Sequence, residues 1–114
     1  MSVMFVYVTT GDREEALSIG RQVVEEEFAA CANVLPGITS VFRWQGKVEE
    51  AEEAMLILKT TEAKLERLIG RVKSLHSYDC ACIEALPVVE GNRDFLEWVV
   101  RATGGDPRQL LDPI

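Results

Sequence analysis

The sequence predicts an α+β fold of the ferredoxin-like class, a split βαβ sandwich with a long protruding β-hairpin and an extra C-terminal helix. Apolar patterns follow the order strand, helix, strand, strand, helix, strand and then a further helix. The second and third strands form a hairpin that is long for a chain of 114 residues. With 47% hydrophobic residues, the chain can build one core. We therefore expect a single domain over residues 1–114, with its core at about 3–103 and a C-terminal tail at 104–114.

The first strand is expected at residues 3–10, and its apolar character on both faces favours a central place in the sheet. Asp12 suits the N-cap of the following helix, with Glu15 three residues later as in a capping box. The apolar stripe of that helix has i, i+4, i+7 and i+8 spacing and consists of Ala16, Gly20, Val23, Val24 and Phe28.

The hairpin runs out through a kink at Pro36-Gly37, turns at Gln45-Gly46 and returns over residues 47–61. At about 3.3 Å per residue, the return strand would be roughly 40 Å long or more. A compact domain of this size is only about 34 Å across. The hairpin must therefore curl or lean on another copy, because a long unpaired strand edge promotes aggregation. The sequence thus predicts a homo-oligomer.

Thr61 is expected to cap a second helix, whose apolar stripe is the most regular in the chain. That stripe comprises Leu65, Leu68, Ile69, Val72 and Leu75. A fourth strand is expected over residues 78–88, and Gly91-Asn92 introduces a third helix with Phe95, Leu96, Val99 and Val100. The tail is expected to be a loop with a short docking segment at Leu110-Leu111.

Composition and charge limit the classes of molecule that this chain is expected to bind. A net charge of -7 argues against nucleic acid and anionic membranes, and weakly favours cations. The first apolar run has no basic residue before it, so it is read as a strand and not as a signal peptide, and no apolar run is long enough to span a membrane. Three cysteines without disulfide-framework spacing indicate reduced thiols and a cytoplasmic protein.

Five segments carry a resemblance to a known family. They are Ala29-Ala30-Cys31-Ala32-Asn33, Pro36-Gly37-Ile38-Thr39-Ser40, Arg43-Trp44-Gln45-Gly46-Lys47, Leu56-Ile57-Leu58-Lys59-Thr60 and Ala85-Leu86-Pro87-Val88. In this order they resemble the hallmark segments of the CutA family of divalent-cation tolerance proteins, and the match runs from about Phe5 to Thr103. The resemblance implies a ferredoxin-like subunit, a homotrimer built through the hairpin and a role in tolerance of copper and other divalent metals.

One segment departs from the family pattern, which usually has His-Pro-Tyr-Glu at the start of the fourth strand. Here the sequence is His76-Ser77-Tyr78-Asp79, and Cys82 stands where a glutamate is usual. The departure alters any site or metal preference built on this segment.

The candidate metal ligands are His76, Cys80 and Cys82, which could hold a soft ion such as Cu(I) or Zn(II). The alternatives are structural. His76 could be a C-terminal helix cation, since it is expected to end the second helix. Cys80 and Cys82 could be small side chains that fill one face of the fourth strand.

Two function classes follow. The first is a non-enzymatic trimer that binds copper or another divalent cation weakly between subunits. The second is a PII-like signalling trimer that binds an anionic metabolite or a protein, with Arg43, Lys59 and the turn at residues 9–12 as anion contacts. The Phe42 and Trp44 face of the hairpin is expected to be a subunit contact, and the acidic run at residues 49–53 to be solubilising. We find neither a glycine-rich phosphate loop nor a nucleophile elbow, so no enzyme is predicted.

Overall fold

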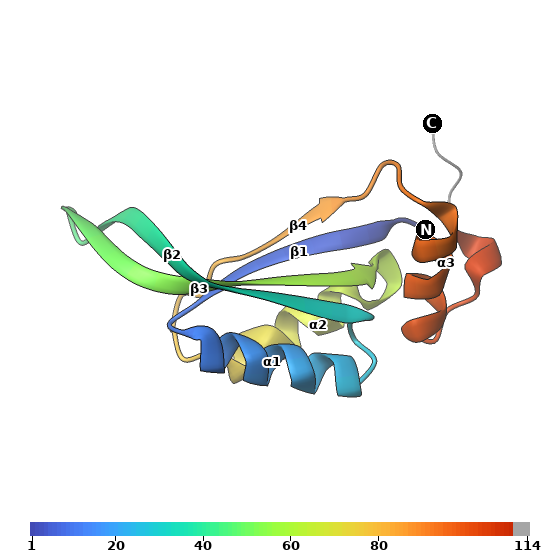
Figure 1. Cartoon of the computed structure of the whole chain (residues 1–114), viewed down its shortest axis with the longest axis horizontal. Coiled ribbons are helices and arrows are strands. Elements are labelled where there is room, and N and C mark those ends of the chain that lie inside the picture. The colour runs from blue at the N-terminus through green and yellow to red at the C-terminus, as the bar shows by residue number, and fades with distance from the viewer. Residues whose placement is uncertain (111–114) are drawn as a thin grey trace.

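The computed structural model describes residues 1–110 and confirms the ferredoxin-like fold class (Figure 1). The elements in chain order are β1 (Val3–Thr10), α1 (Arg13–Glu25), β2 (Cys31–Trp44), β3 (Lys47–Thr61), α2 (Glu62–Leu75), β4 (Ile83–Pro87), α3 (Arg93–Ala102) and a 3-10 turn, η1 (Pro107–Gln109). The four strands form one antiparallel sheet in the order β2-β3-β1-β4. As expected, β1 lies inside the sheet between β3 and β4.

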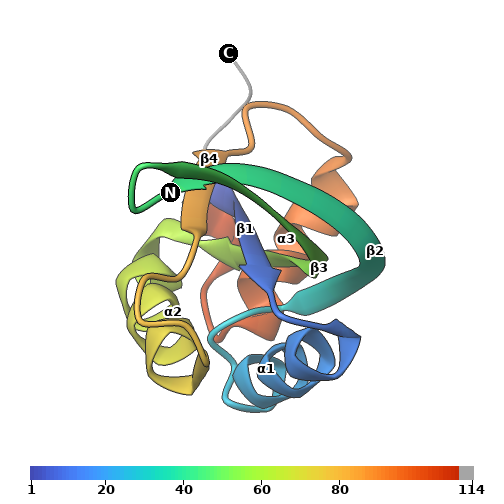
Figure 2. The ribbon, with the colours of Figure 1, turned by 90° about the vertical axis from the view of Figure 1, so that its left-hand side faces the viewer.

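Helices α1 and α2 cover the same face of the sheet and lie next to each other, as the view along the strands shows (Figure 2). Side chains alternate across a strand, so every second residue of β1 and β3 points at these helices. The resulting core contains Val6 and Val8 of β1 and Leu56 and Leu58 of β3. From the helices it includes Ala16, Ile19, Val23, Leu68 and Val72.

The long hairpin of β2 and β3 projects beyond the body of the domain, and we call its outer part, residues 38–53, the arm (Figure 1). The register between β2 and β3 shifts between Leu35 and Ile38, where Gly37 has a φ of 78°. The tip turns through Gln45 and Gly46, both with positive φ, which is typical of two-residue hairpin turns. The arm stretches the molecule to 48 × 29 × 22 Å.

Helix α3 lies across the end of the sheet opposite the arm (Figure 1). Its Leu96, Val99 and Val100 pack with Val3 and Ala30 in a second apolar cluster. Leu110 is buried in the same cluster, which confirms that the tail docks there, while Leu111 lies outside the described residues. Within residues 1–110, no helix is both long enough and apolar enough to cross a membrane.

The fourth strand is shorter than predicted, because residues 76–82 form a loop before Ile83. In this loop the N–H groups of Ser77 and Tyr78 bond to side chains, not to a neighbouring strand. Cys80 and Cys82 therefore do not share a strand face. Thr61 is the N-cap residue of α2, as predicted, but its side chain makes no capping bond. The first turn is instead joined to Ser2 through Glu62.

Two smaller expectations are also corrected. Phe28 lies beyond the end of α1, where its N–H donates to the carbonyl of Val23. Arg43 and Lys59, grouped above as anion contacts, do not face each other across the hairpin, because the register pairs Arg43 with Val48 and Lys59 with Cys31.

Candidate functional site

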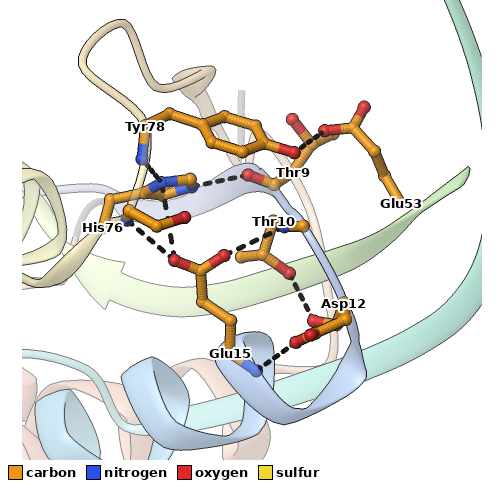
Figure 3. Close-up of polar contacts among 9 residues, drawn as sticks. Thr9, Thr10, Asp12, Glu15, Glu53, His76 and Tyr78 are labelled. Atoms are coloured by element: carbon orange, nitrogen blue, oxygen red, sulfur yellow. Dashed lines mark hydrogen bonds and ion pairs between the residues drawn. The ribbon is translucent and has the colours of Figure 1, made fainter. Parts of the chain in front are cut away.

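Polar side chains from four segments meet where β1 ends and α1 begins (Figure 3). The loop after α2 brings His76 and Tyr78 to this point, and the base of the arm brings Glu53. Helix α1 contributes Glu15 from its first turn. Hydrogen bonds link these segments, which are up to 67 residues apart in the sequence.

Glu15 holds the start of α1 and the loop together. The Oδ1 of Asp12 accepts from the Glu15 N–H at 2.8 Å, which confirms Asp12 as the N-cap. The Glu15 carboxylate accepts from the N–H of Gly11 at 2.9 Å and from the N–H of Ser77 at 2.8 Å. Burial alone would raise the pKa of Glu15, but the hydrogen bonds from Ser77 and Gly11 outweigh it and lower the pKa.

The imidazole of His76 is fully buried and uses both of its nitrogens. Nε2 lies 2.7 Å from the carbonyl oxygen of Thr9, and Nδ1 accepts from the Tyr78 N–H at 3.0 Å. A carbonyl only accepts and an amide N–H only donates, so these partners assign the neutral tautomer with its proton on Nε2. His76 thus has a structural role, because it ties the loop to β1. It lies at the C-terminal end of α2, which is where the sequence placed it.

Tyr78 connects the loop to the arm. Its hydroxyl donates to Oε2 of Glu53 at 2.8 Å, and its ring lies 4.8 Å from that of His76. Burial and the adjacent Glu53 raise the pKa of Tyr78 to about 12. The phenol is therefore a hydrogen-bond donor throughout the physiological pH range.

The two loop cysteines differ in their surroundings. Cys80 is exposed, whereas Cys82 is half-buried with its thiol 3.7 Å from Oε1 of Glu84. Burial and the charge of Glu84 raise the pKa of Cys82, which disfavours the thiolate that metals prefer. Within the part of the chain that the structure describes, no three or more His, Cys, Asp or Glu side chains are grouped to hold a metal ion. His76, Cys80 and Cys82 are therefore not assembled into a metal site by a single protomer.

The anion contacts considered for the second function class are not brought together either. The Gly11 N–H in the turn at residues 9–12 is already bound by Glu15. Arg43 lies near the tip of the arm, and Lys59 lies eleven residues farther along β3 than Val48, the partner of Arg43, or about 36 Å at strand spacing. Lys59 instead donates to Oδ1 of Asn33.

Sequence reasoning missed the parts of this cluster that come from distant segments. Glu15 was recognised only as a capping residue, yet its carboxylate also binds Ser77, 62 residues away. Glu53 was assigned to a solubilising acidic run, although it accepts from Tyr78. The single available signal was the position of His76 and Tyr78 in a family segment, which points to the loop but not to its partners.

The sheet face opposite α1 and α2, here called the open face, is the other prominent surface. It carries alternate residues of the four strands, including Phe5, Tyr7, Cys31, Leu35, Met55, Ile57, Lys59 and Leu86. Leu35 is 53% exposed and Leu86 is 60% exposed. Apolar side chains on this face thus remain uncovered by the helices that bury the other face.

Comparison with known proteins identifies the chain's relatives. Residues 4–102 match the model of the CutA1 divalent ion tolerance protein family. The divalent-cation tolerance protein CutA of Thermus thermophilus is 46% identical over 99 residues, or 87% of this chain and 96% of that protein. The human protein CutA is 41% identical over 102 residues, or 90% of this chain, which spans only 57% of the human protein.

Solved structures agree with these matches. The divalent cation tolerance protein of Thermus thermophilus superposes with a TM-score of 0.87 at 45% identity, covering 90% of this chain and 99% of that chain. CutA1 from Oryza sativa superposes with a TM-score of 0.86 at 39% identity, covering 90% of this chain and 94% of that chain. The chain therefore belongs to the CutA1 divalent ion tolerance family.

Proposed function

We propose that this chain acts in tolerance of divalent cations as a homotrimer, with copper or another divalent cation bound weakly between protomers. We further propose that it works by binding and not by catalysis, and that it does so in the cytoplasm. Membership of the divalent ion tolerance family supports the cellular role. The three free cysteines suit a reducing compartment.

The open face carries the proposal of self-association. It presents Leu35 and Leu86 to solvent at more than half of their full exposure, next to the arm with its exposed Phe42 and Trp44. Apolar residues on this scale are typical of interface cores, and aromatic residues are enriched there. A second copy of the chain would cover the open face and support the arm, which projects from the body of the domain (Figure 1).

The distribution of donors supports a cation site between protomers. His76 would have to release Thr9 or Tyr78 before it could bind an ion, and breaking such a buried bond costs about 1–3 kcal/mol. The better placed donors are Cys82 and Glu84, which lie together, and the exposed Cys80. We propose that these side chains, joined by His76 after rearrangement, bind a cation only when a neighbouring protomer completes the set.

Two measurements test the proposal. Light scattering at low micromolar concentration should give three times the chain mass of 12.7 kDa, and a monomer mass would refute self-association.

Calorimetric titration of reduced protein with Cu(I), Cu(II) and Zn(II) should show saturable binding that a Cys80→Ser/Cys82→Ser double variant loses. Cys31→Ser is the matched control, because it removes a thiol from β2 and leaves the loop intact. Absence of binding in the parent protein would refute the proposed cation binding.

A further inference from the structure

Lys59 is a charged residue in the middle of an otherwise largely apolar surface. It lies on β3, where the register places it beside Phe5 of β1 and Cys31 of β2. Its neighbours along the same face of β3 include Ile57 and Met55. The side chain is half-buried, although α1 and α2 cover the other side of the sheet.

Within residues 1–110, Lys59 has no carboxylate partner. Its ammonium donates to the side-chain oxygen of Asn33, which is neutral. Four arginines differ in this respect, since each pairs with an acidic side chain in its own chain. These pairs are Arg13–Glu14, Arg71–Glu26, Arg93–Glu97 and Arg108–Asp106.

Burial of the open face against another protomer would take the Lys59 ammonium out of water. Removing an ammonium from water without a counter-charge costs several kcal/mol, which would oppose association. The same charge becomes favourable when the partner surface supplies a carboxylate with good geometry. An acidic group opposite Lys59 would therefore favour association through the open face.

The chain carries suitable acidic groups on its arm. Glu52 accepts from the hydroxyl of Thr39 and Glu53 from that of Tyr78, whereas Glu49 and Glu50 face the apolar residues Phe42 and Val41 in the register. Both Glu49 and Glu50 are exposed. Their own Lys59 is out of reach, because nine residues of strand separate it from Glu50, or about 30 Å.

We propose that Lys59 binds a carboxylate on the arm of a second copy of this chain, supplied by Glu49 or Glu50. This ion pair would fix where the arm of one protomer lies on the open face of its neighbour. The inference rests on the proposed homotrimer and adds the residues that set the register of its interface. Arm-to-face contacts of this kind can repeat head to tail around a ring, which is the closed heterologous arrangement that a trimer has.

Four variants test the pair by their effect on the concentration at which the oligomer dissociates, followed by sedimentation velocity. Lys59→Met should raise that concentration at least tenfold, as should Glu49→Gln/Glu50→Gln. Combining all three changes should be no worse than Lys59→Met alone, because the pair is already broken. Lys73→Met, at an exposed lysine of α2, is the matched control and should leave dissociation unchanged.

An Asn33→Ala variant separates the ion pair from the internal bond of Lys59, since it removes that bond and keeps the charge. Asn33 lies on the same open face, since it pairs with Ile57, so the variant should dissociate closer to the parent concentration than Lys59→Met does. The ion pair is overturned, and the homotrimer stands, if the Lys59→Met oligomer is as stable as the parent. The same holds if the effects of the glutamate and lysine changes on the dissociation concentration simply add. A parent protein that is monomeric at all concentrations would overturn both.

Discussion

The hydroxyl of Tyr78 donates to Oε2 of Glu53 at 2.8 Å and so joins the loop after α2 to the base of the arm. The N–H of Tyr78 also donates to Nδ1 of His76, so Tyr78 contacts both the buried imidazole and the arm. The loop and the arm are consequently not independent. A change in the direction of the arm at Glu53 is expected to disturb the loop that carries Cys80 and Cys82.

This contact predicts a specific ultraviolet titration. The chain has two tyrosines, and burial with the adjacent Glu53 raises the pKa of Tyr78 to about 12. Spectrophotometric titration of Tyr78→Phe should therefore lose the tyrosinate signal that appears near pH 12 and retain the signal of Tyr7. A Glu53→Gln variant should lower the apparent pKa of Tyr78, because the carboxylate charge that opposes tyrosinate formation is gone. A Tyr78 signal near pH 10 in the parent would contradict this interpretation.

His76 is expected to be required for stability. His76→Ala leaves the Thr9 carbonyl and the Tyr78 N–H without their buried partner, and should lower the free energy of unfolding by about 2–4 kcal/mol. His76→Gln can restore a donor near Thr9, and His76→Asn an acceptor near Tyr78, so each should recover part of the loss. Urea denaturation at pH 7 without metal measures all three. An Ala variant as stable as the parent would show that His76 is not a structural residue.

The sequence predicted the elements well because strong local signals define them. Asp12 and Asn92 are capping residues whose side chains bond as their type suggests, and Gln45-Gly46 forms the expected tight turn. The alternating burial of β3 follows from its apolar block. These features depend on residues that are close in the sequence.

The candidate site was less predictable because its contacts are distant in sequence. Residues 78–82 have the composition of a strand, yet the Glu15 carboxylate and the His76 ring bind the N–H groups of Ser77 and Tyr78, and β4 begins only at Ile83. No local sequence pattern indicates that the carboxylate of a capping glutamate will accept a hydrogen bond from a segment 62 residues away. Whether Arg43 and Lys59 meet was undecided by the sequence for a similar reason, since it depends on a register that only the folded hairpin sets.

Stability is expected to fall in acid partly through Glu15. The folded state lowers the pKa of this carboxyl below its ordinary value of 4.5, so its contribution is present above that pH and is lost as the pH falls through the folded pKa. Glu15→Gln has no such proton to bind. The difference in unfolding free energy between parent and variant should therefore be largest at pH 6–7 and shrink below about pH 4.5. Guanidinium denaturation across this range measures it, and a constant difference would contradict the assigned role.

Two helical glycines should respond in opposite ways to the same substitution. A Cβ at Gly70 of α2 would meet no atom within 4 Å, so Gly70→Ala should stabilise the protein by about 0.5–1 kcal/mol through helix propensity alone. A Cβ at Gly20 of α1 would lie 2.9 Å from the Cβ of Ala32 and 3.2 Å from Cδ1 of Leu56. Gly20→Ala should therefore destabilise the protein by about 1–3 kcal/mol, because α1 would have to move away from the sheet. Thermal and urea unfolding of both variants test this, and a stabilising Gly20→Ala would show that α1 packs less closely on β2 and β3 than these distances require.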